Sequence, residues 1–226
     1  MKTTKTEAIV LRRTNYGETD RILQLITPTG KISVMARGVR KEKSKLAGGI
    51  ELFAVCDVVI GEGKGELGVL TSSRLIKFYK NIMVDYDRMQ FAYLAIKLVS
   101  GASEMVDGAD WYDILSEVLA GLDAITIPLG LIQTWFYLHY AEVLGYGLSL
   151  QYDVDGNKLS ADNKYQYSDE DKGLRLAENG DIGSDHIKFL RLVQSKSLKV
   201  LVQVGGIGDI LPDCLMIARR HAAIKV

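Results

Sequence analysis

Six cations crowd one short stretch of this sequence, residues 30–49, where they face a single acid, Glu42. Lysine and arginine side chains at such density can bind phosphate oxygens and release the counterions condensed around a polyanion. A solvated loop without a ligand is the alternative interpretation, so the charge of the whole chain matters. The six cations are Lys31, Arg37, Arg40, Lys41, Lys43 and Lys45.

Charge is distributed unevenly along the chain. The formal net charge of the 226 residues is zero, yet residues 1–80 hold fifteen Lys or Arg against eight Asp or Glu. The remaining residues carry the opposite excess, thirteen basic against twenty acidic side chains. This asymmetry indicates that the first third contacts a polyanion, although a surface that is lopsided by chance would show the same numbers.

Patterns typical of catalysis are missing from the sequence. It contains no G-x-x-x-x-G-K-[S/T] phosphate loop, and its glycine-rich segment GEGKGELG joins two predicted strands instead of opening a helix. His139, His186 and His221 are far apart, and no C-x-x-C pair exists for a thiolate zinc site. We therefore expect no catalytic residue, no metal site and no cofactor.

Five short strands are predicted to position the cations. In the third, Ile32, Val34 and Ala36 alternate with polar or larger residues, as in a strand with one buried face. Closely spaced strands without a long helix favour a small closed barrel of the OB type, whose second and third strands bind oligonucleotides. An SH3-like barrel is the alternative. The predicted strands span residues 5–13, 20–27, 30–38, 51–60 and 66–72, with 79 as an alternative end of the last strand and a turn near 45–47.

The predicted barrel assigns a binding face. Lys31 and Arg37 would point outward on it, and Arg21 would enter from the second strand, although both faces of that strand are largely apolar. Tyr16, in the predicted loop 14–19, is the aromatic residue best placed to stack on a base. Packing of Tyr16 against the barrel is an equally good interpretation.

A helical period begins at Asp85 and predicts a second, mainly α-helical domain. Met89, Tyr93, Ile96 and Leu98 would form the apolar stripe of its first helix. The expected fold class is α+β multidomain, with an OB-fold domain at 1–80, a helical domain at 81–226 and a β-hairpin insertion at about 148–178. Helices are predicted at 85–99, 110–122, 129–144, from Ser184 as N-cap, at 198–204 and at 211–225, with hairpin turns at 155–156 and 171–173.

The cysteines and the uncharged segment suggest a cytoplasmic protein. Cys56 and Cys214 each lie in an apolar run, as small buried residues in a reducing compartment do. Residues 124–141 carry no charge, but Pro128 and His139 and the flanking acids favour a buried helix over a membrane span. The first ten residues show no apolar core of signal-peptide length.

A set of short motifs in the first seventy residues resembles the N-terminal domain of the bacterial RecO family, and the similarity continues less distinctly through the helical part. Each motif is weak alone, but their order over about sixty residues is specific. They are Tyr16-Gly17-Glu18, Asp20-Arg21, Leu25, Thr27, Gly30-Lys31, Ala36-Arg37-Gly38, Lys43-Ser44, Leu46, Gly48, Gly68-x-Leu70-Thr71 and Gly145-Tyr146.

The resemblance implies a non-enzymatic mediator of DNA repair and recombination, located at the nucleoid. Such a protein binds single- and double-stranded DNA, anneals complementary strands and works with RecR and single-stranded-DNA-binding protein to load RecA. RecF and RecA would be indirect partners, and no membrane is involved. The DNA-binding residues expected here are Tyr16, Arg21, Lys31, Arg37, Arg40, Lys41, Lys43 and Lys45.

One departure from the family pattern concerns zinc. Many members carry a four-cysteine zinc motif after the Gly-Tyr segment, but the matching positions here, near Asp153 and Gly156 and at 176–180, contain no cysteine. The insertion is expected to hold together by hairpin pairing and packing alone. Two other functions stay open at this point, a protein-interaction adaptor with the barrel as scaffold and an RNA-binding OB protein.

Overall fold

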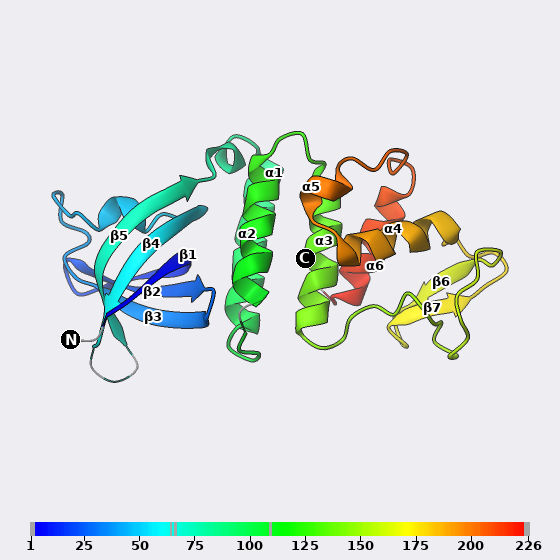
Figure 1. Ribbon diagram of the computed structural model, residues 1–226, viewed down its shortest axis with the longest axis horizontal. Coiled ribbons are helices and arrows are strands. Elements are labelled where there is room, and N and C mark those ends of the chain that lie inside the picture. The colour runs from blue at the N-terminus through cyan, green and yellow to red at the C-terminus, as the bar shows by residue number, and fades with distance from the viewer. Residues whose placement is uncertain (1–2, 64, 66, 109, 224–226) are drawn as a thin grey trace. The chain divides into compact units, whose positions relative to one another are not determined.

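The computed structural model describes residues 3–63, 65, 67–108 and 110–223. These form two compact units, Met1–Asp123 and Ala124–Val226 (Figure 1). The strands of the first unit end near residue 80, where we expected the nucleic-acid-binding domain to end. The compact unit continues beyond them through two helices, whereas the domain boundary at residue 80 stays a prediction.

Strands in the described part of the first unit form a closed barrel in the order β1-β2-β3-β5-β4 (Figure 1). The long first strand pairs with β4 through its first half and with β2 through its second half. The last strand closes the barrel by running parallel to β3, with Val34 opposite Gly68. This is an OB-fold arrangement and not the SH3-like alternative. The strands are β1 (Thr3–Tyr16), β2 (Asp20–Thr27), β3 (Gly30–Ala36), β4 (Ala54–Gly61) and β5 (Gly68–Phe78).

The predicted alternation of the third strand is confirmed. Val34 and Ala36 are fully buried in the barrel core, whereas Lys31, Ser33 and Met35 on the opposite face are half-buried. A period of two is what a strand with one face in the core requires. The predicted turn near 45–47 is a 3₁₀ helix, η1 (Ala47–Gly49). The predicted hairpin after β4 falls partly on residues 64 and 66, outside the described residues.

Two helices follow the barrel in the same unit, α1 (Tyr86–Ala102) and α2 (Asp110–Asp123), after a 3₁₀ helix, η2 (Lys80–Met83). The Asp85 side chain caps α1 by accepting the Arg88 backbone N–H at 3.1 Å. Arg88 itself is buried, and its guanidinium donates to the carbonyls of Gly121 and Leu122 at the end of α2. A cation at a helix C-terminus is electrostatically favourable, so Arg88 joins the two helices.

The predicted apolar stripe of α1 is wrong except at Ile96. Tyr93 is 46% exposed, and Met89 and Leu98 are only half-buried. Alanines make up half of the buried apolar face, and alanine gives a weak signal in a search for large apolar side chains. The buried apolar residues of α1 are Phe91, Ala92, Ala95, Ile96, Val99 and Ala102.

These helices cover part of the outer surface of the barrel. Ile9 and Ile26 face each other across β1 and β2, outside the barrel core, and both are fully buried. The second helix contacts β1, β2 and β3, and the first contacts β1. Tyr112 adds a polar link by donating its hydroxyl to the Glu7 carboxylate at 2.7 Å. The pKa of Tyr112 is raised, first by burial and then by Glu7.

The second unit contains α3 (Leu129–Val143), α4 (Ser184–Ser195), α5 (Leu198–Leu201) and α6 (Leu211–His221), with the hairpin β6 (Tyr165–Ser168) and β7 (Gly173–Leu176) (Figure 1). The helix α3, whose only charged residue is Glu142 near its end, is buried over most of its length and packs mainly on α6. Gly130 faces α6, since a Cβ there would lie at ordinary contact distance, 3.6 to 3.7 Å, from the Leu211 and Leu215 side chains. Within the described residues, no helix is long and apolar enough to cross a membrane.

Three predictions for the second unit needed correction at helix ends. The helix expected at 198–204 stops at Leu201. The last helix stops at His221, and residues 224–226 lie outside the description. Ser184 is the first residue of α4 and not its cap; Gly183 takes the cap position and donates its N–H to His186 Nδ1 at 3.3 Å.

Both cysteines are buried free thiols, as predicted. Cys56 lies in β4 and Cys214 in α6, each 1% exposed or less. Burial raises the pKa of Cys56 to about 11 and that of Cys214 to about 12. Neither thiol is therefore ionised near neutral pH, which suits a core residue and not a nucleophile or metal ligand.

Candidate nucleic-acid interface

The basic loop, residues 37–45, begins against the turn that joins β1 to β2. The backbone N–H of Arg40 donates to the Thr19 carbonyl at 2.9 Å, and its guanidinium donates to the Gly17 carbonyl at 3.2 Å. The N–H of Gly38 donates to the Asp20 carboxylate at 2.7 Å. Gly17 and Gly38 both have φ near +60°, a conformation in which glycine carries no Cβ strain. The β1–β2 turn and the basic loop, which are separated in the sequence by β2 and β3, therefore form one surface.

The far end of the basic loop is also held. Ser73 on β5 donates its hydroxyl to the Leu46 carbonyl at 2.9 Å. Gly49 passes so close to Ser73 that a Cβ there would lie 2.6 Å from the Ser73 backbone. The loop is consequently fixed where it leaves β3 and where it reaches β5, while the cations between these points extend into solvent.

Five predicted cations share this exposed position. None of them takes part in an ion pair among the described residues, although Arg37 and Lys41 lie close enough to Asp20 to lower its pKa. Exposed cations that form no ion pair can neutralise phosphates and so release the counterions condensed on a nucleic acid. The five are Arg37, Arg40, Lys41, Lys43 and Lys45.

Tyr16 and Arg21 border the same surface. Tyr16 ends β1 opposite Asp20 and is 55% exposed, so its ring is available for stacking. Arg21 pairs with Asn15 across β1 and β2, and its Nε donates to the Asn15 side chain at 3.1 Å. Arg21 alternates with the core residues Leu23 and Leu25, so its half-buried side chain lies at the end of the inward-facing side of β2, where its guanidinium meets the exposed Asn15.

Lys31 is not part of this surface. It sits near the opposite end of β3, beside Ile26 in the strand pairing, whereas Arg37 follows the end that pairs with Arg21. Its ammonium donates to the Glu104 carboxylate at 2.8 Å and to the Ser100 carbonyl at 2.9 Å, and its side chain is only 12% exposed. The pKa of Glu104 is lowered, first by the hydrogen bond from the Lys31 ammonium and then by the charge of Lys31.

Sequence reasoning did not single out Asp20 or Asn15 as parts of the surface. Asp20 was noted only as part of the motif Asp20-Arg21 that begins the second strand, and an acid is not expected among phosphate-binding cations. The available signal was its position at the start of a strand and next to a glycine-containing turn, where carboxylates often accept backbone N–H groups.

The residues at the expected zinc positions do not fit zinc. The Asp153 side chain stabilises its own turn, because its Oδ1 accepts the backbone N–H groups of Asp155 and Asn157 at 3.0 and 2.8 Å. Residues 176–180 offer one further carboxylate, that of Glu178, which is exposed. Two oxygen donors without a thiolate or imidazole are not a tetrahedral zinc set. No group of three or more metal-binding side chains occurs among the described residues.

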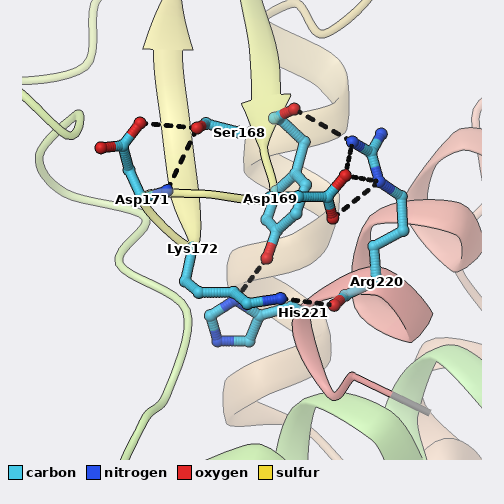
Figure 2. Close-up of polar contacts among 7 residues, drawn as sticks. Ser168, Asp169, Asp171, Lys172, Arg220 and His221 are labelled. Carbon is cyan, nitrogen blue, oxygen red and sulfur yellow. Dashed lines mark hydrogen bonds and ion pairs between the residues drawn. The ribbon is translucent and has the colours of Figure 1, made fainter.

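A contact network joins the β6–β7 hairpin to α6 (Figure 2). Arg220 forms a short ion pair with Asp169 and also donates to the Tyr167 carbonyl at 3.4 Å. The next residue is His221. Its Nδ1 lies 3.0 Å from the Tyr167 hydroxyl, and its Nε2 lies 2.6 Å from the Tyr146 carbonyl oxygen. Lys172, in the hairpin turn, donates to the Arg220 carbonyl at 3.4 Å. We call these contacts the hairpin clasp.

Known proteins resemble the chain over both units. The family sequence model described as "Recombination protein O N terminal" matches residues 1–79. A "DNA repair protein RecO" from Dehalococcoides mccartyi is 33% identical, with 96% of this chain and 88% of that protein covered. One from Roseiflexus sp. is 35% identical, covering 63% of this chain and 50% of that protein. One from Bacillus cytotoxicus is 40% identical over 44% of this chain and 40% of its own length.

Proposed function

Since the chain belongs to the RecO family of DNA repair proteins, we propose that its barrel binds single- and double-stranded DNA without sequence preference. The observation that carries this proposal is the exposed position of the cations of the basic loop beside Tyr16, without acid partners among the described residues. Such cations contact phosphates, which position a protein on DNA but do not specify sequence. Arg21 lies at the edge of the proposed surface.

The same surface supports a role in strand annealing. Two complementary strands repel each other through their phosphates, and a cationic surface without sequence preference lowers this repulsion. Tyr16 would add sequence-tolerant stacking on an unpaired base. We propose that the protein acts at the nucleoid with RecR and single-stranded-DNA-binding protein to help RecA load, with RecF an indirect partner. This is a binding role without a catalytic step.

The test is the quadruple variant R37A/R40A/K41A/K43A. Single-stranded oligonucleotide binding, followed by fluorescence anisotropy over a salt series, should weaken by about tenfold or more at moderate salt. The slope of log K against log salt should become shallower by about 2 to 3, because each lost phosphate contact with a single strand contributes about 0.7. Annealing of complementary oligonucleotides should slow in parallel.

A matched control removes four exposed lysines elsewhere, in K97A/K158A/K188A/K199A. This variant has the same net charge as the quadruple variant and should retain most of the wild-type affinity and salt slope. Wild-type binding by the basic-loop variant, or equal loss in the control, would refute the proposed surface. Strong competition by structured RNA over DNA would instead favour an RNA-binding function.

A further inference from the structure

A carboxylate lies within the proposed cationic surface. Asp20 is the first residue of β2, and its Oδ1 accepts the Gly38 backbone N–H at 2.7 Å and the Thr19 hydroxyl at 3.0 Å. These two hydrogen bonds, followed by the charges of Arg37 and Lys41, lower its pKa, so Asp20 is ionised at neutral pH.

The charge of this carboxylate opposes phosphate binding, so its position needs a different explanation. Gly38 is the second residue of the basic loop, where the chain turns away from β3 with a φ of +61°. The hydrogen bond from its N–H to Asp20 ties that turning point to the β1–β2 turn, next to the contacts that Arg40 makes with Thr19 and Gly17. The direction in which the loop leaves the barrel therefore depends on Asp20.

We propose that Asp20 is the positioning residue of the DNA-binding surface, holding the basic loop so that its cations and Tyr16 face one strand together. This inference rests on the proposed function. It predicts that losing the acceptor in Asp20→Ala weakens binding even though the same change removes a negative charge from the surface, whereas charge alone would predict tighter binding. Ordering a loop before binding reduces the entropy lost on association.

Three single variants separate position from charge. Asp20→Ala removes both the charge and the acceptor, whereas Asp20→Asn removes the charge but keeps a side-chain oxygen that can accept the Gly38 N–H. Glu18→Ala removes a charge from the same turn, at an exposed side chain for which the described structure shows no hydrogen bond or ion pair. Single-strand affinity and its salt slope are measured for each.

We expect Asp20→Ala to weaken binding by about fivefold, with a shallower salt slope, since fewer cations reach phosphates at once. Asp20→Asn should bind at least as tightly as wild type, and Glu18→Ala likewise. Amide hydrogen exchange at Gly38, measured in the same folded samples, should accelerate in Asp20→Ala and stay slow in Asp20→Asn.

The outcomes distinguish this inference from the proposed function. If Asp20→Ala binds as tightly as Glu18→Ala while R37A/R40A/K41A/K43A binds more weakly than wild type, the positioning role is overturned and the proposed function stands. Equal weakening in Asp20→Ala and Asp20→Asn would overturn it as well, because the acceptor would then make no difference. Wild-type binding by the quadruple variant would refute the proposed function itself.

Discussion

At the level of single residues, the neighbours of a cation decide whether it can meet a phosphate. Lys31 and Arg37 border the same strand, yet Lys31 is bound to Glu104 and the Ser100 carbonyl, whereas Arg37 is exposed and forms no ion pair among the described residues. The ammonium of Lys31 already has its partners, and binding to DNA would have to break them. We infer that Lys31 contributes least among the eight expected DNA-binding residues.

A pair of single variants tests this inference. Lys31→Ala should lower the free energy of unfolding by about 1 kcal/mol, because the Ser100 carbonyl loses a charged donor, and should change the oligonucleotide Kd by less than about twofold. Arg37→Ala should do the reverse, weakening binding with little loss of stability. Urea unfolding and anisotropy measure both quantities. Equal weakening of binding by the two variants, with Lys31→Ala as stable as wild type, would place Lys31 on the binding surface after all.

At the level of secondary structure elements, the β6–β7 hairpin depends on its contacts with α6. The hairpin clasp joins three residues of the hairpin, Tyr167, Asp169 and Lys172, to two adjacent residues at the end of that helix (Figure 2). Since a carbonyl can only accept, His221 Nε2 donates to Tyr146, which leaves neutral Nδ1 to accept from the Tyr167 hydroxyl. The pKa of Tyr167, raised to about 12 mainly by burial, keeps that hydroxyl protonated.

The clasp predicts a loss of stability in acid. Burial lowers the pKa of His221, and the nearby charge of Lys172 adds to this, against a smaller opposing effect of the Tyr146 carbonyl. An unfolded histidine takes up a proton near pH 6.5. The stabilisation by neutral His221 is therefore complete above about pH 6.5 and is lost as the pH falls through the lower folded pKa. Urea midpoints at pH 7.5 and 5.5 should differ, the second being lower.

His221→Gln is the control for this pH dependence, because glutamine does not titrate. Its urea midpoint should be lower than that of the wild type at pH 7.5 and should change less between the two pH values. A chelator should leave the wild-type midpoint unchanged. An equally large pH effect in the variant would assign the acid sensitivity to other groups in the unit.

The elements differed in how well the sequence predicted them. The strand 20–27 and the helices starting at Asp110 and Leu129 have the predicted bounds to within a residue, since alternation and strong apolar runs are local signals. The buried face of α1 was wrong because alanines form it, and their burial depends on what packs against them. The cap of α4 was also wrong, because Gly183 and His186 replace the expected serine.

At the level of the whole molecule, the barrel and the first two helices form one compact unit, although the family model ends at residue 79. A fragment of residues 1–80 would expose Ile9 and Ile26, which are fully buried in the intact chain. We expect it to be less stable than the fragment 1–123 by about 3 to 6 kcal/mol, from about 1.5 to 3 for each side chain. Such a loss is comparable with the entire stability of a small domain.

Thermal and urea unfolding of the two fragments, followed by circular dichroism, would measure the difference. The longer fragment should unfold in one cooperative transition and bind the oligonucleotide. Equal stability of the shorter fragment would show that the helices are dispensable for the barrel, as the domain boundary expected at residue 80 implies.

Packing between elements also explains what the sequence could not predict about the candidate site. The excess of cations in the first eighty residues and the barrel itself were readable from composition and alternation. The contact of Lys31 with the end of α1, and that of Asp20 with Gly38, join residues 73 and 18 positions apart. Local periodicity contains no information on which distant groups meet, so the sequence predicted neither the contact of Lys31 with Glu104 nor that of Asp20 with Gly38.

The two buried thiols have a practical consequence for studying this protein. Cys56 lies in one compact unit and Cys214 in the other, and both are shielded from solvent. A thiol reagent can reach either one only after its own unit opens. The modification rates of the two peptides, read by mass spectrometry, would therefore report the opening of each unit separately, without any introduced label.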